Sequence, residues 1–379
     1  MPIHFDKTRY ANLAETYDRW WNGTLGRPLI KIMVRDAFEP NREKPNVPLL
    51  SQANCHQFDY TAEQIVDRID YELSKCEFLG DAFPMVNMWS FGPGVLAAFC
   101  GAELENASGS VWFKASPKEI EDVHIAYDGD NKWIKRIKEI YQAGIDRWGD
   151  SVVLGMPDLG GFQDVVANFL DSQELLMALI EDEDEVHRLQ DEVYTAWMAA
   201  YQDLASVISA GSPGFSDWGG LYSKTPSYIL QDDFAFMISP RAFKEFGYPE
   251  IKKACLTLPH TIYHLDGVGN LNHLDQLLDL KELNAIQWVY GAGQPPAREW
   301  MDVYERIYQA GKGIELVGDL DDFYALYPKY GDKLFYQCTI DGEDAFATRM
   351  MDEKDCIHSY KVFPCSEKEN VLKLLKEIH

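Results

Sequence analysis

The stretch that decides the fold lies between residues 261 and 338, where four short apolar runs follow one another. They read TIYH (261–264), AIQWV (285–289), GIELV (313–317) and KLFYQC (333–338), and a fifth run, SVVLG (151–155), precedes them. Each run is rich in β-branched or aromatic residues, which is typical of buried parallel strands. Residues with helical periodicity lie before and after each run, so we predict alternating strands and helices.

Alternation of this kind is typical of two architectures, the doubly wound sheet and the (β/α)8 barrel. A Gly-x-Gly-x-x-Gly loop at the start of a helix would favour the doubly wound sheet, and the sequence contains none. We therefore predict an α/β protein with a (β/α)8 TIM barrel. No linker-like run of Pro, Gly or Ser divides the chain. The prediction is a single domain over residues 1–379, in which residues 1–60 form an N-terminal extension packed on the barrel.

Three capping boxes predict helix starts, because in each a Ser or Thr is followed three residues later by Gln or Glu. They lie at Thr61–Gln64, Ser116–Glu119 and Ser366–Glu369. In the second box Pro117 occupies the first helical position, which proline favours.

The net charge of the chain excludes some classes of binding partner. The chain has 61 acidic and 35 basic residues, for a formal net charge of −26. A field of that sign repels phosphate backbones and anionic lipids, so we expect neither nucleic acid nor a membrane surface as a partner. The first 21 residues mix charges with aromatics and lack the apolar stretch of a signal peptide, which predicts a cytoplasmic protein.

Functional groups of a barrel lie where its strands end. His264 and Asp266 stand two residues apart at the end of one predicted strand, and Cys338 ends the last one. An imidazole, a carboxylate and a thiolate are ligands that zinc accepts, and they leave a fourth position for a substrate atom. Each residue also has an ordinary interpretation, because strand-end histidines are commonly hydrogen-bonded core residues and lone cysteines are commonly small buried hydrophobes.

Asp217 and the pair Asp232 and Asp233 bracket a polar stretch. These acids are candidates for orienting a cationic or polyhydroxyl substrate. The same stretch is equally compatible with a solvated loop that ends in a helix cap, since Ser239 and Pro240 start the next predicted helix. Further candidates for substrate contacts are aromatic residues and an acid beside a glycine pair, namely Trp89, Phe91, Asp158, Trp218 and Tyr263.

Several kinds of chemistry are excluded by missing motifs. The sequence has no Gly-x-Ser-x-Gly, no Walker A loop, no His-Glu-x-x-His and no Cys-x-x-Cys. A fragment at Asp122 and His124 begins like a cobalamin-binding Asp-x-His-x-x-Gly, but Tyr127 stands at the glycine position. Any corrinoid must therefore be supplied by another protein.

The segment from Asp232 to Pro249, with its Ser-Pro-x-x-Phe-x-x-Phe, is similar to a segment of the uroporphyrinogen decarboxylase superfamily. This superfamily includes the cobalamin-linked methyltransferases of the coenzyme M type. The sequence HLDG (264–267) resembles their His-x-Cys-Gly, and Cys338 falls where they carry a second ligand cysteine. The resemblance implies a (β/α)8 barrel that uses zinc to activate a thiol for methyl transfer. Asp266 replaces the first ligand cysteine, which makes the ligand set harder and leaves the metal open.

The leading hypothesis is a zinc-dependent methyltransferase that moves a methyl group between a small substrate and a corrinoid carried by a separate protein. In it, His264, Asp266 and Cys338 bind zinc or another divalent metal, and the acids Asp217, Asp232 and Asp233 act on the substrate. The alternatives are a decarboxylase-like lyase acting on a small carboxylate or hydroxylated substrate, and a non-catalytic barrel that binds a small molecule. A homodimer is compatible with each of them.

Overall fold

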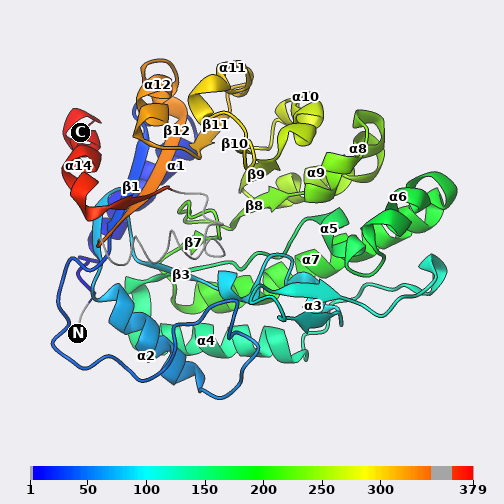
Figure 1. Cartoon of the computed structure of the whole chain (residues 1–379), viewed down its shortest axis with the longest axis horizontal. Coiled ribbons are helices and arrows are strands. Elements are labelled where there is room, and N and C mark those ends of the chain that lie inside the picture. The colour runs from blue at the N-terminus through cyan, green and yellow to red at the C-terminus, as the bar shows by residue number, and fades with distance from the viewer. Residues whose placement is uncertain (1–2, 343–360, 379) are drawn as a thin grey trace.

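Alternating strands and helices form a mixed α/β fold with a parallel-strand sheet (Figure 1). The computed structural model describes residues 3–342 and 361–378. The strands are β1 (Leu29–Val34), β2 (Glu77–Gly80), β3 (Met85–Asn87), β4 (Glu103–Glu105), β5 (Trp112–Lys114), β6 (Val153–Gly155), β7 (Phe215–Ser216), β8 (Ser227–Gln231), β9 (His260–Asp266), β10 (Ala285–Val289), β11 (Gly313–Leu316), β12 (Leu334–Asp341) and β13 (Lys361–Pro364).

The helices connect these strands and cover them. They are α1 (Arg9–Trp21), α2 (Ala62–Leu73), α3 (Leu96–Phe99), α4 (Lys132–Trp148), α5 (Phe162–Ala167), α6 (Ser172–Glu181), α7 (Glu183–Gly211), α8 (Pro240–Phe246), α9 (Tyr248–Thr257), α10 (Leu274–Leu278), α11 (Met301–Gln309), α12 (Leu320–Tyr330) and α14 (Lys368–Ile378). None of the helices in the described part of the chain combines the length and apolar character needed to span a bilayer.

The main sheet has the strand order β2-β1-β12-β11-β10-β9-β8, and β13 pairs with β12. All pairs in it are parallel except β1 with β2. From β8 to β12 the spatial order equals the chain order, and each crossover contains a helix, as in successive βαβ units. Figure 1 shows these strands following one another along an arc, with α8 to α12 on its outer side. The arc places the carboxyl ends of β8 to β12 at one edge.

A second parallel sheet has the order β3-β6-β7, and β4 and β5 form a separate antiparallel pair. Strand β7 approaches β8, but no strand ladder joins the two parallel sheets among the described residues. Hydrogen-bonded strands therefore form two open parallel sheets there, where a closed ring was predicted.

The five apolar runs are all strands, which confirms that part of the prediction. The runs 151–155, 261–264, 285–289, 313–317 and 333–338 overlap with β6, β9, β10, β11 and β12. Each is buried because helices or other strands cover it, and this explains why the sequence there is nearly continuous in apolar residues.

Within residues 1–60, expected to form an N-terminal extension packed on the barrel, residues 29–34 form an internal strand of the main sheet. Strand β1 lies between β12 and β2, and its register pairs Leu29 with Phe335. Helix α1 seals the amino-terminal ends of the strands with buried aromatics. The indole of Trp20 donates to the Leu334 carbonyl over 3.1 Å, and that of Trp21 donates to the Tyr222 carbonyl over 2.9 Å.

The capping boxes have different outcomes. Thr61 caps α2 reciprocally with Gln64, because each side chain accepts a hydrogen bond from the other residue's backbone N–H. The box at Ser116 starts no α-helix, and only a 3-10 turn forms at residues 120–122. Val123 and Ile125 are buried while the residues between and around them are exposed, an alternation that fits extended chain rather than a helix. The third box precedes α14, as predicted.

Candidate functional site

A row of polar side chains crosses one face of the otherwise apolar main sheet. In the register, His264 of β9 pairs with Gln287 of β10, and Gln287 pairs with Glu315 of β11. Gln337 of β12 pairs with Lys31 of β1, and its side-chain amide donates to Glu315 Oε1 over 3.0 Å. Because side chains alternate between the two faces of a strand, these five residues share one face. The row of polar side chains therefore lies on this one face of the sheet.

At the carboxyl ends of β8 and β9, three potential metal ligands converge. Asp233 lies two residues after the end of β8, whereas His264 and Asp266 lie two residues apart at the end of β9. One ligand atom from each of these residues lies within 4.8 Å of the others. Because β8 and β9 are adjacent parallel strands, their ends bring these residues to the same edge of the sheet. One imidazole nitrogen and two carboxylate oxygens are a ligand set that suits zinc and harder divalent ions.

His264 is held in place by its neighbours. Its Nδ1 is hydrogen-bonded to Gln287 Oε1, which leaves Nε2 as the nitrogen available to a metal. The ring of Trp218 meets the His264 ring edge to face, with 5.1 Å between the centroids. Burial lowers the pKa of His264, against the opposing charge of Asp266. The imidazole is therefore kept neutral, which is the form that binds metals.

Cys338, predicted as the third ligand, is not part of this group. It lies on β12, three strands away from β9 in the sheet, and on the opposite face of β12 from Gln337. Its side chain is 3% exposed and packs in the hydrophobic core, and burial raises the pKa of its thiol. The residue that the structure groups with His264 and Asp266 is Asp233.

The acids Asp217 and Asp232 occupy different surroundings from Asp233. Asp217 is buried and accepts hydrogen bonds from the backbone N–H groups of Gly219 and Gly220, and burial raises its pKa to about 6. This pattern shows that Asp217 shapes the loop after β7. Asp232 is 1% exposed, neither of its oxygens has a hydrogen-bond partner in the described part of the chain, and burial raises its pKa strongly. Ser239 caps α8, as the alternative interpretation of this stretch predicts.

The predicted substrate contacts divide into two groups. The ring of Trp218 contacts His264, and the ring of Trp89 lies 5.8 Å from that of Trp218. Phe91 and Tyr263 are 0% and 1% exposed and belong to the hydrophobic core. Asp158 is also buried, accepts a hydrogen bond from the Gly160 N–H over 2.8 Å, and has its pKa raised to about 8 by burial. Of the predicted contacts, Trp218 is thus placed beside the candidate metal ligand His264, and Trp89 contacts Trp218.

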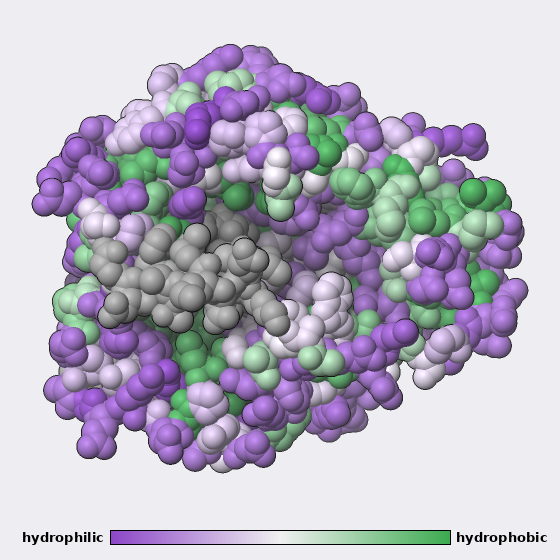
Figure 2. Space-filling view, in the orientation of Figure 1, coloured by the Kyte–Doolittle hydropathy of each residue, from purple (hydrophilic) through white to green (hydrophobic). Residues whose placement is uncertain are grey.

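A cavity of about 930 Å³ extends from the polar face of the sheet toward α2. Lys31, Trp218 and Gln337 line its inner part. Trp218 therefore contacts both the cavity and His264, and connects the two features. Figure 2 shows that the molecule is hollowed near the middle of this face and that the surface visible around the hollow is largely hydrophilic.

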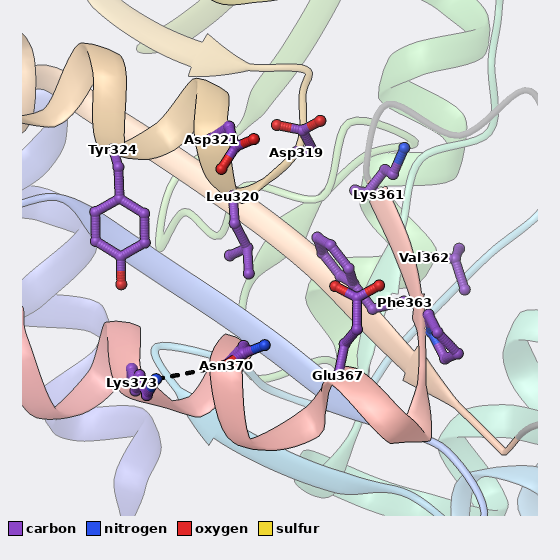
Figure 3. A pocket seen from close by; sticks show the side chains of 11 residues that line it. Asp319, Leu320, Asp321, Tyr324, Lys361, Val362, Phe363, Glu367, Asn370 and Lys373 are labelled. Carbon is purple, nitrogen blue, oxygen red and sulfur yellow. Dashed lines mark hydrogen bonds between the residues drawn. The ribbon is translucent and has the colours of Figure 1, made fainter.

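A second pocket, of about 550 Å³, lies between α12, β13 and α14 (Figure 3). Its walls combine the carboxylates of Asp319, Asp321 and Glu367 with two lysines. None of the candidate metal ligands lines this pocket, and the Trp218 that contacts His264 lines the larger cavity instead, so the candidate site lies at the ends of β8 and β9.

Sequence reasoning missed Lys31, Gln287, Glu315 and Gln337. A signal for them exists, because each is the polar residue inside an apolar strand, as in LIKIMV (29–34) and GIEL (313–316). A charged or amide side chain is rarely buried unless it is paired or functional, so such interruptions mark the inner face of a site.

Glu315 predicts a specific pH dependence of stability. Burial, reinforced by Asp217, raises its pKa from 4.5 to about 8, so the folded state retains a proton that the unfolded chain releases. Stability from this group is present below pH 4.5 and decreases as the pH rises toward 8. Glu315→Gln keeps the shape and removes the titration. We expect its melting temperature relative to wild type to be higher at pH 8 than at pH 5, measured by calorimetry.

The control for this experiment is Glu181→Gln, at an exposed position of α6. The difference in melting temperature between this variant and wild type should be the same at pH 5 and at pH 8. A Glu315→Gln difference that is equally independent of pH would contradict the assignment of Glu315 as a proton-retaining group.

Comparison with known proteins gives a likeness of fold. No protein-family model and no curated protein matches the chain. Among solved structures, the chain is similar to a methyltransferase from Methanosarcina mazei, with a TM-score of 0.54 and 16% sequence identity over 85% of this chain and 91% of that chain. The protein thus has a methyltransferase-like fold.

Proposed function

We propose that the protein is a metal-dependent methyltransferase that moves a methyl group between a small substrate and a corrinoid carried by a separate protein. The observation that carries this proposal is the convergence of Asp233, His264 and Asp266 at the carboxyl ends of two adjacent strands. The likeness of fold to the methyltransferase from Methanosarcina mazei supports methyl transfer as the reaction type. We also propose that the two parallel sheets together form a (β/α)8 barrel, which the continuous order from β8 to β12 supports.

The residues present fit a catalytic metal site. Three protein ligands leave a coordination position for a substrate atom, as in catalytic zinc centres. When bound, the metal supplies Lewis acidity, which lowers the pKa of a coordinated thiol or water. Two carboxylates make the set harder than a thiolate site, so manganese or iron competes with zinc more strongly here.

The chain's own residues prepare this site. Gln287 orients the His264 ring through its Nδ1, and Trp218 covers one side of the imidazole. Trp89 packs against Trp218 and supports it in that position. The corrinoid must approach from the carboxyl ends of the strands, because the amino-terminal ends near α1 are sealed by Trp20 and Trp21.

A second candidate function, a lyase acting on a small carboxylate or hydroxylated substrate, is favoured by a different observation. Burial raises the pKa of Glu315 and of Asp158 to about 8, and burial lowers that of Lys31 to about 8. Groups that titrate near neutral pH serve well as general acids and bases. Of these three residues Lys31 lines the cavity, so its side chain can exchange a proton with a ligand there in a reaction without methyl transfer.

The experiment that separates these possibilities combines metal analysis with a methyl-transfer assay. Purified wild-type protein should contain about one equivalent of divalent metal and, with coenzyme M as acceptor, should consume methylcobalamin, followed by its absorbance. Asp233→Asn should lose both metal and activity. Cys338→Ser should keep both, because its thiol lies in the core on the other face of β12.

If Cys338→Ser loses metal and activity while Asp233→Asn keeps both, the result would support the His-Asp-Cys ligand set and refute the site proposed here. Metal binding without consumption of methylcobalamin would favour the lyase. A wild-type protein that binds no divalent metal would exclude the metal-dependent function.

A further inference from the structure

We propose that the cavity of about 930 Å³ binds a small organic anion whose charged group is held by the ammonium group of Lys31. This inference rests on the proposed function and deepens it, because it names the substrate class as an organic anion with an apolar body. It is argued from the contacts of Lys31, from the other cations of the cavity and from the cavity walls.

The ammonium group of Lys31 lies in the cavity wall with free hydrogen-bonding capacity. Its Nζ donates to the carbonyl of Gly220 over 2.8 Å and lies 4.4 Å from the centroid of the Phe83 ring. An ammonium group has three donors, and only this one is engaged within the described residues. No carboxylate of the described chain forms an ion pair with it. Two donors thus remain for a ligand.

Of the other cations that line the cavity, Lys44 is exposed to solvent, and the remaining three have carboxylate partners. Arg68 pairs with Glu72 over 2.6 Å, and Lys75 pairs with the same carboxylate over 3.3 Å. Arg35 pairs with Asp341 over 3.4 Å. Among the partly or fully buried cations of the cavity wall, the lysine of β1 is therefore the group whose charge is left for an external anion.

The acids near Lys31 do not neutralise its ammonium group, so it stays available to an external anion. Burial raises the pKa of Glu315 to about 8, so its carboxyl is largely neutral at pH 7. Asp217 is ionised at that pH, but its Oδ1 accepts the N–H groups of Gly219 and Gly220. Burial lowers the pKa of Lys31 to about 8, which still leaves mostly ammonium at pH 7. A buried ammonium without a close counter-ion is costly, and a bound anion offsets that cost.

The remaining walls define the rest of the ligand. Much of the lining is apolar and includes Ile69, Leu73, Phe78, Phe83, Met85 and Val86. Such walls bury a hydrocarbon or aromatic body rather than a sugar-like one. Trp218 belongs to the cavity wall and also contacts His264, with ring centroids 5.1 Å apart. A ligand anchored at Lys31 can therefore extend toward the candidate metal ligands.

The test uses two probes of the same shape that differ in charge, benzoate and benzamide. Calorimetric titration of the full chain without added metal at pH 7 should show benzoate binding at least about 10-fold more tightly than benzamide, because a charge-assisted hydrogen bond is stronger than a neutral one. In Lys31→Met this preference should disappear, while benzamide binds as in wild type. The matched control Lys252→Met, at an exposed position of α9, should keep the full preference.

Phenylphosphonate and benzenesulfonate, titrated in the same way, show which anionic group the site prefers. The inference would be overturned by any of three results. They are equal affinity of wild type for benzoate and benzamide, a preference for benzoate that survives in Lys31→Met, and no binding of either probe at about 10 mM. Because the titration needs neither metal nor methyl transfer, its failure is distinguishable from failure of the proposed function. Anion binding without metal-dependent methyl transfer would refute only the latter.

Discussion

Replacing His264 by alanine should lower the affinity for divalent metal by more than about 100-fold, because the site loses its only nitrogen ligand. Loss of a hydrogen bond that supports a ligand lowers metal affinity by about 10- to 100-fold, and loss of the ligand itself should cost more. The remaining Asp233 and Asp266 carboxylates offer oxygen donors alone, which select against zinc. The measurement is competition with a chromophoric chelator at pH 7. Circular dichroism should show an unchanged fold, since β9 is held on both sides by β8 and β10.

Gln287→Leu is a milder change at the same candidate metal site. It removes the hydrogen bond to His264 Nδ1 and leaves all three ligands in place. The metal affinity should fall by about 10- to 100-fold, less than in His264→Ala. If Gln287→Leu binds metal as wild type does, Gln287 does not position the ring. If His264→Ala does so, the metal centre is assigned wrongly.

Replacing Asp70 by alanine should lower the free energy of unfolding by about 1–3 kcal/mol, because the buried indole N–H of Trp148 loses its acceptor. The carboxylate of Asp70 accepts hydrogen bonds from Arg42 over 3.0 Å and from Arg147 over 2.9 Å. Its other oxygen accepts the indole N–H of Trp148 over 3.0 Å. These contacts tie α2 to α4, and the side chain of Asp70 is 4% exposed. Urea denaturation followed by tryptophan fluorescence measures the loss.

Asp67→Ala is the matched control for this prediction. Asp67 pairs with the same two arginines, but its side chain is 36% exposed. Solvent screens such a pair, so the loss should stay below about 1 kcal/mol. Equal losses in the two variants would show that burial of Asp70 is not the source of the stability. Metal affinity should be unchanged in both, because neither residue belongs to the candidate metal ligands.

The sequence by itself determined the local elements whose signal lies within a few residues. The five apolar runs became strands because continuous β-branched and aromatic residues suit a strand covered on both faces. Thr61 and Gln64 cap a helix because the capping hydrogen bonds are local. The pairing of His264 with Asp266 was equally local, since residues two apart lie on one face of a strand.

Only the tertiary structure decided which distant residues join these local features. Asp233 rather than Cys338 meets His264 because β8 is the neighbour of β9, whereas β12 lies three strands away, or about 14 Å along the sheet. Lys31 entered the cavity because β1 pairs with β12, a contact between residues about 300 positions apart in the chain. Strand order and register depend on the packing of the whole sheet, so no pattern within one segment determines them.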